Sequence, residues 1–130
     1  MGKKINLIVA ILYSIIIIVI ETSMNIYWDD WSFYPLWIID YLIAIILLSA
    51  VFIFKKNIQN SMLLIGWSLS VGVTYMALFI SLDPNGLKSE DIEIKLPLFI
   101  LALIVSIFGL TLTIIELQKI NHLDNKWIKY

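Results

Sequence analysis

Long uninterrupted apolar runs are the feature that most constrains this chain. They cover roughly residues 5–20, 36–54, 62–82 and 96–117. A helix needs about 20 apolar residues to cross a hydrocarbon core of about 30 Å, and the last three runs have that length. The first run reaches it when Lys3 and Ser23 are included, because a lysine side chain can extend toward the headgroups. The runs predict four transmembrane helices, with bounds of about 4–22, 35–55, 61–82 and 96–118.

Composition supports a membrane-embedded domain. Hydrophobic residues make up 61% of the 130 residues and charged residues 15%, against about 45–50% and about 25% in soluble domains. Backbone groups in lipid must be hydrogen-bonded internally, and runs such as 15–18, which are all isoleucine, lack the alternation of barrel strands. We expect residues 1–130 to form one all-α integral membrane domain. Because its connections are short, we expect an antiparallel four-transmembrane-helix bundle.

Lysine placement predicts the orientation of these helices. With the N-terminus inside, only Lys88 and Lys95 lie outside, and most of the acids lie at the outer boundary. The cytoplasmic lysines are then Lys3, Lys4, Lys55, Lys56, Lys119, Lys126 and Lys129. This positive-inside bias predicts an N-in, C-in protein with both termini cytoplasmic. The isoleucine- and lysine-rich, arginine-free composition favours a bacterial inner (plasma) membrane.

Aromatic residues gather around the start of the second run. They are Tyr27, Trp28, Trp31, Tyr34, Trp37 and Tyr41. Trp and Tyr side chains are enriched where the membrane meets water, because their rings are apolar and their N–H or O–H groups are polar. We predict that these residues form an aromatic belt at the outer headgroup level.

Asp40 is the strongest candidate for a functional side chain. It lies inside the second run, where an ionisable group is costly and often functional. One interpretation, which we favour, anchors it at the interface near the helix N-terminus, where the macrodipole stabilises a carboxylate. In the other, Asp40 faces inward above Ala44 and meets Glu21 or Asp83. Two carboxyl groups so placed would bind a cation or share a proton.

Small and polar residues recur at helical spacing in three of the runs. The third run carries Gly66, Ser70 and Thr74, and the fourth carries Ala102, Ser106 and Gly109. The first run carries Asn6, Ala10 and Ser14 on one face. Small side chains let membrane helices approach closely, and hydroxyl groups bond across them. We interpret these stripes as helix packing in preference to a hydrophilic pathway.

The C-terminal segment continues with helical periodicity. Ile120, Leu123 and Trp127 share a face within residues 119–130, which predicts a C-terminal interfacial helix on the cytoplasmic leaflet. Glu116 and Lys119 stand three residues apart, a spacing that predicts a weak surface ion pair.

Motifs give no catalytic assignment. The sequence contains no HExxH, GxSxG or Walker A pattern and no cysteine, so we expect no enzymatic activity, no cofactor and no metal. Scattered lysines and acidic loops argue against a nucleic-acid partner. Our leading expectation is a non-catalytic interaction or accessory subunit of a membrane complex, whose partner is the bilayer plus another membrane protein or another copy. The alternative is a homo-oligomeric channel or transporter for a small cation or proton with an outer carboxylate site. A lipid-modifying enzyme is a third class that no motif supports.

Overall fold

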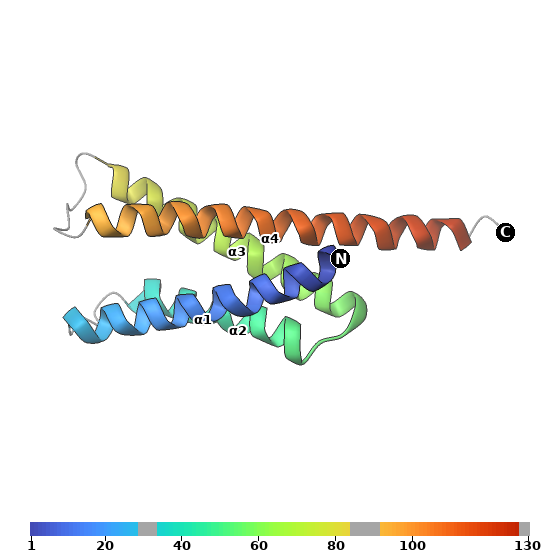
Figure 1. The fold of residues 1–130 in the computed structure, drawn as a ribbon, viewed down its shortest axis with the longest axis horizontal. Helices are drawn as coiled ribbons and strands as arrows, with labels where there is room; N and C mark the ends of the chain where they lie inside the picture. The colour runs from blue at the N-terminus through green and yellow to red at the C-terminus, as the bar shows by residue number, and fades with distance from the viewer. Residues whose placement is uncertain (29–33, 84–91, 128–130) are drawn as a thin grey trace.

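The computed structural model describes residues 1–28, 34–83 and 92–127 and folds them into four helices (Figure 1). They are α1 (Gly2–Trp28), α2 (Tyr34–Phe52), α3 (Lys56–Leu82) and α4 (Ile92–Trp127). The described residues include no strand. The predicted all-α class is therefore confirmed for this part of the chain.

Three of the helices extend well beyond the bounds expected from the apolar runs. α1 continues to Trp28 and α4 continues to Trp127 without a break after residue 118. Neither extension contains Gly or Pro, and a polar sequence without those residues can continue a helix outside the apolar region. Pro97 lies inside the first turns of α4. α3 begins at Lys56, directly after an extended Lys55.

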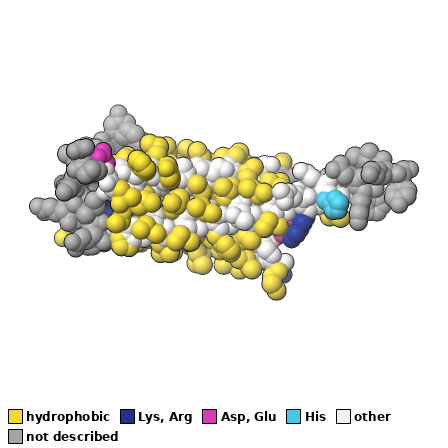
Figure 2. Space-filling view, turned by 90° about the horizontal axis from the view of Figure 1, so that it is seen from above, with side chains coloured by type: hydrophobic (Ala, Val, Ile, Leu, Met, Phe, Trp, Pro, Cys, Tyr) yellow, Lys and Arg dark blue, Asp and Glu magenta, His cyan; other side chains and the backbone are white. Residues whose placement is uncertain are grey.

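Three helices are long and apolar enough to cross a membrane. The apolar stretches are Gly2–Tyr27, Ile58–Leu82 and Lys95–Leu123. The described apolar part of α2, Trp37–Phe52, is shorter. Figure 2 shows hydrophobic side chains along the whole middle of the molecule, with an acidic side chain near one end and lysine and His122 toward the other. This surface is typical of a protein surrounded by lipid.

The four helices enclose one interior. α1 packs against α2 and α4, and α3 packs against the same two helices. α1 and α3 face each other across the interior and meet through side chains from both helices. The N-terminus and the C-terminal end of α4 lie toward the same side in Figure 1, and α4 extends beyond the other helices there.

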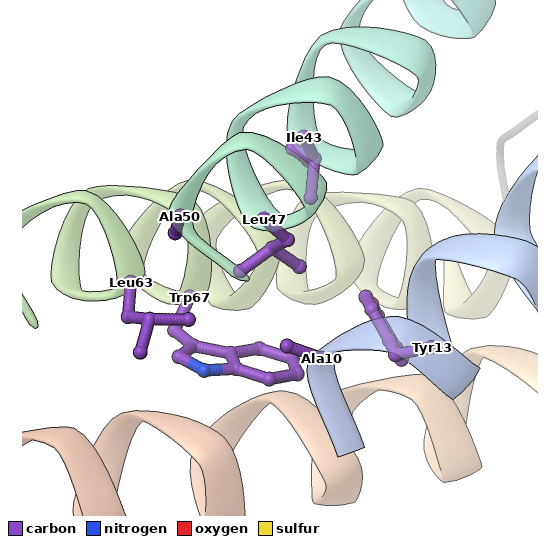
Figure 3. Packing of buried hydrophobic residues seen from close by; sticks show 7 residues of the cluster. All are labelled: Ala10, Tyr13, Ile43, Leu47, Ala50, Leu63 and Trp67. Carbon is purple, nitrogen blue, oxygen red and sulfur yellow. The ribbon is translucent and has the colours of Figure 1, made fainter. Parts of the chain in front are cut away.

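The core centres on Trp67, which is fully buried between α3 and α4 and lies beside Ala10 of α1 (Figure 3). Two glycines permit this packing. A Cβ atom on Gly66 would lie 2.6 Å from Leu47 of α2, and one on Gly109 would overlap the Trp67 indole. These positions therefore accept no larger side chain unless a neighbouring helix moves.

Candidate functional site

Two carboxyl groups from different helices meet near one end of the interior. Glu21 of α1 and Asp40 of α2 lie close enough to interact directly, and both side chains are partly buried. An ionised carboxylate can only accept hydrogen bonds, so a hydrogen bond between the two groups would require a proton on one of them. Two neighbouring carboxyl groups favour such a shared proton, because both cannot easily be ionised together.

The position of Asp40 follows from the packing face of α2. Asp40, Ala44 and Leu47 share a face at i, i+4 and i+7. Ala44 and Leu47 are fully buried, so this face of α2 points into the interior. The small Ala44 side chain leaves room for α1 to approach, and Glu21 lies on that helix. Asp40 thus lies on the same face of α2 as these two buried residues.

Polar and charged groups surround the carboxyl pair. Asn25, one turn beyond Glu21, donates its side-chain amide to Glu21 Oε1 at 3.4 Å. Lys95 of α4 lies within electrostatic range of Glu21 and offsets the negative charge of the pair. The hydroxyl groups of Thr22 and Tyr41 are 2.6 Å apart and join α1 to α2 at this level. A singly protonated pair beside a lysine has no net charge, which lowers the cost of placing it in a membrane.

A cluster of three hydroxyl groups lies next along the interior. Tyr13 Oη is 2.5 Å from Ser70 Oγ and 3.0 Å from Ser106 Oγ, and the two serine oxygens are 2.7 Å apart. The three side chains come from α1, α3 and α4. Asp40 lies within electrostatic range of the Tyr13 hydroxyl. Because a hydroxyl group both donates and accepts, this hydroxyl cluster can pass a proton between its members.

A second polar cluster joins the same three helices further from Asp40. The Trp67 indole N–H donates to Asn6 Oδ1 at 3.0 Å, and Asn6 Nδ2 donates to Thr113 Oγ1 at 2.8 Å. All three residues are buried. Because the Asn6 amide is both donor and acceptor, it satisfies a buried group on α3 and another on α4.

Asn60 is the buried polar residue nearest the start of α3. It lies two turns before Trp67 on the same helical face and is only 2% exposed. Its Nδ2 atom has no hydrogen-bond partner among the described residues. The preceding residue, Gln59, donates its amide to the Ala50 carbonyl at 2.9 Å, so only Asn60 leaves a buried donor unmatched there.

The structure joins two of the three carboxyl groups named from the sequence. Glu21 and Asp40 form the pair, whereas Asp83 is an exposed residue at the C-terminal cap of α3. The predicted boundary pair of Glu116 and Lys119 is confirmed, with Nζ and Oε1 3.2 Å apart.

The predicted aromatic belt is only partly visible. Tyr27 is exposed, and the Trp37 and Tyr41 rings are half-buried and meet edge to face at 5.9 Å. Trp31 lies outside the described residues, as do the side chains of Trp28 and Tyr34. The aromatic belt therefore stays a prediction.

Residues from the small and polar stripes lie at helix contacts. Ser70 and Ser106 bond to each other, and Gly66 and Gly109 face neighbouring side chains. Thr74 donates to the Ser70 carbonyl at 2.7 Å, and Ser106 donates to the Ala102 carbonyl at 2.6 Å. In these hydrogen bonds each hydroxyl group donates to the backbone carbonyl four residues earlier in its own helix.

Sequence reasoning missed Tyr13 and Trp67. One signal could have identified both: tryptophan and tyrosine prefer the membrane interface, yet these two lie in the middle of apolar runs. Tyr13 is also seven residues from Asn6, on the same helical face. A polar ring atom at such depth requires a partner, and the partners are members of the two interior clusters.

The described residues contain no group of three or more His, Cys, Asp or Glu side chains that could hold a metal ion. The chain matches no known family model, and no characterised protein or solved structure is similar to it. Function must therefore be argued from the interior itself.

Proposed function

We propose that the chain forms an antiparallel bundle of four transmembrane helices with both termini cytoplasmic. Three helices have spanning length. α2 has 19 residues, which at about 1.5 Å per residue gives about 28 Å, close to the hydrocarbon thickness. The lysine distribution supports the N-in orientation. In this orientation Glu21 and Asp40 lie toward the outer side, and Asn60 lies toward the cytoplasm.

Within this bundle, we propose that the Glu21–Asp40 pair binds and releases a proton during proton transport across the membrane. The proximity of two partly buried carboxyl groups on neighbouring helices is the observation that carries the proposal, because two such groups favour sharing one proton. Ionisable groups inside membrane helices commonly mark proton relays. Loss of the shared proton would leave two neighbouring negative charges, a state that favours uptake of another proton or a small cation.

The surroundings of the pair favour proton transport over a pair that holds a proton without passing it on. Tyr13 lies within electrostatic range of Asp40 and belongs to the hydroxyl cluster. That cluster leads from the carboxyl pair toward the centre of the bundle. Lys95 provides a positive charge near Glu21, which stabilises the pair when its proton leaves.

A liposome flux measurement tests the transport proposal. The protein is reconstituted with a pH-sensitive dye inside, and a potassium gradient with valinomycin drives protons inward. We expect Asp40→Asn to lower the proton flux by at least about tenfold, equivalent to a barrier about 1.4 kcal/mol higher. Asp83→Asn is the matched control, because it removes an outer carboxylate outside the pair. Equal flux in wild type and Asp40→Asn, with both proteins folded, would contradict the proposal.

A second candidate function is a non-catalytic interaction subunit of a membrane complex. The observation that favours it is the C-terminal part of α4, which extends beyond the other helices (Figure 1). Leu123 in this part is 57% exposed. In the proposed orientation this segment continues α4 out of the membrane into the cytoplasm, where another protein can reach it. Native mass spectrometry of protein purified from its own membrane distinguishes a co-purifying subunit from a homo-oligomer.

A further inference from the structure

Trp67 separates two groups of polar side chains in the interior. On the side of Asp40 lies the hydroxyl cluster of Tyr13, Ser70 and Ser106. On the other side, Asn6 and Thr113 form the next polar contact. The indole is fully buried between these groups, and Figure 3 shows it in the space between α3 and α4 beside Ala10. Polar groups therefore line the interior on both sides of one large ring.

The indole is held from several directions. Its centroid is 5.2 Å from that of Tyr13, with the rings tilted by 53°. A Cβ atom on Gly109 would overlap the ring, so α4 lies directly against it. Its N–H group donates to Asn6 at 3.0 Å. Because these contacts come from α1 and α4 while Trp67 belongs to α3, the ring closes the interior across three helices.

The cytoplasmic side contains an unmatched donor. Asn60 lies two turns below Trp67 on the same face of α3, and its buried Nδ2 has no described partner. Buried polar groups are nearly always hydrogen-bonded to protein or to ordered water. An internal water molecule is the simplest partner for an isolated buried amide donor. Water at this position would extend the polar interior from Thr113 toward the cytoplasm.

We propose that Trp67 is a gate that interrupts a water-assisted proton pathway between the Glu21–Asp40 pair and a water site at Asn60. This inference rests on the proposed transport function. In the structure the gate is closed, because the indole occupies the space between the hydroxyl cluster and Asn6. Opening requires the indole to rotate away from Gly109 and to release its hydrogen bond to Asn6. Water can then connect the two sides.

The test compares Trp67→Ala with Leu47→Ala in the same liposome assay. Both changes remove a fully buried side chain, but Leu47 belongs to α2 and makes no contact with the polar clusters through a hydrogen bond. We expect Trp67→Ala to raise the proton flux by at least about tenfold, which corresponds to a barrier lowered by about 1.4 kcal/mol. Leu47→Ala should leave the flux within about twofold of wild type. Adding Asp40→Asn to Trp67→Ala should remove most of the increase.

Trp67→Phe provides a second variant if Trp67→Ala does not fold. It keeps an aromatic ring but is smaller and lacks the N–H group, so we expect a smaller increase of about two- to fivefold, equivalent to less than about 1 kcal/mol. Flux that does not rise in the folded Trp67 variants would overturn the gate. An equal rise in Leu47→Ala would also overturn it, because any interior cavity would then cause the leak.

These outcomes separate the gate from the function on which it rests. Wild-type flux that depends on Asp40 but does not respond to Trp67 would leave the transport function standing and remove the gate. The wild-type protein could show no proton flux while Trp67→Ala shows a flux that Asp40→Asn removes. That result would support the gate and contradict transport by the wild-type protein in this assay.

Discussion

The centre of the interior and its acidic end are built from different chemistry. Around Trp67 the polar groups are neutral, and each of Asn6, Thr113, Ser70 and Ser106 has a partner on another helix. At the acidic end, two carboxyl groups lie close together, and Lys95 lies within electrostatic range of Glu21. The polar side chains at the centre are therefore hydrogen-bonded in a single arrangement. The acidic end, by contrast, can exist in two charge states.

The difference indicates that the two parts of the interior have different roles. Neutral hydrogen bonds in a low-dielectric interior fix the arrangement of helices, because a buried group that loses its partner is costly. Titratable groups can change charge without losing all their contacts, and Asn25 and Lys95 both lie near Glu21. Apart from Trp67, whose variants are expected to change proton flux as well, variants at the centre should therefore change stability most, and variants at the acidic end should change function most.

Among variants that keep the large core side chains in place, the largest effect on stability is expected at Gly109. In Gly109→Ala, the added methyl group overlaps the Trp67 indole, so α4 or the ring must move. Overpacking of this kind costs about 1–3 kcal/mol. Gly72→Ala is the matched control on α3, because a Cβ atom there has nothing within 4 Å. Its stability should change by less than about 1 kcal/mol, in the stabilising direction, through helix propensity.

Denaturation by sodium dodecyl sulfate in mixed micelles, followed by circular dichroism, measures both glycine variants. Equal unfolding free energies for Gly109→Ala and Gly72→Ala would mean that the close contact between α4 and the indole does not determine stability. The expected difference in stability between variants of the closely packed centre and variants of the exposed surface would then be absent.

A smaller loss is expected from Asn6→Leu. This change removes the acceptor of the Trp67 N–H and the donor to Thr113 together. An unsatisfied buried donor costs about 1–3 kcal/mol, although bonds between membrane helices average only about 0.6 kcal/mol. We therefore expect a loss of about 1–2 kcal/mol. The same denaturation experiment measures it.

Thr111→Val is the control for Asn6→Leu, because the exposed Thr111 hydroxyl bonds only to the Ile107 carbonyl of its own helix. Its stability should change by less than about 0.5 kcal/mol. A loss in Thr111→Val as large as that in Asn6→Leu would show that bonds within a helix matter as much as the bonds that join three helices.

Most of what could be predicted about the fold came from the apolar runs and from the spacing of the small residues. Run lengths are sufficient to locate the four helices, because only helices of that length satisfy their backbone groups in lipid. Spacing placed Ser70 and Ser106 on the faces that meet. Helix ends were less predictable: α1 and α4 continue through polar sequence that contains no helix-breaking residue.

The pairing of side chains between helices could not be predicted from spacing within one helix. Glu21 and Asp83 were equal candidates for Asp40, and the choice between them depends on how α1 and α2 pack. The partners of Tyr13 and Trp67 could not be predicted for a related reason: their depth in apolar runs shows that each ring needs a polar partner, but not which residue on another helix supplies it. Only the positions of Asn6, Ser70 and Ser106 on other helices give those two rings their polar role.

The proposed sharing of a proton by Glu21 and Asp40 is best tested by infrared spectroscopy of the protein in lipid at neutral pH. A protonated carboxyl group has a C=O stretching band that an ionised carboxylate lacks, and the band shifts on deuteration. Asp40→Asn should remain folded, because its amide can still bond to Glu21. We predict one such band in wild type, absent in Asp40→Asn and in Glu21→Gln and retained in Asp83→Asn. A wild-type spectrum without the band, or a band that survives both substitutions in the pair, would contradict the shared proton and the transport function built on it.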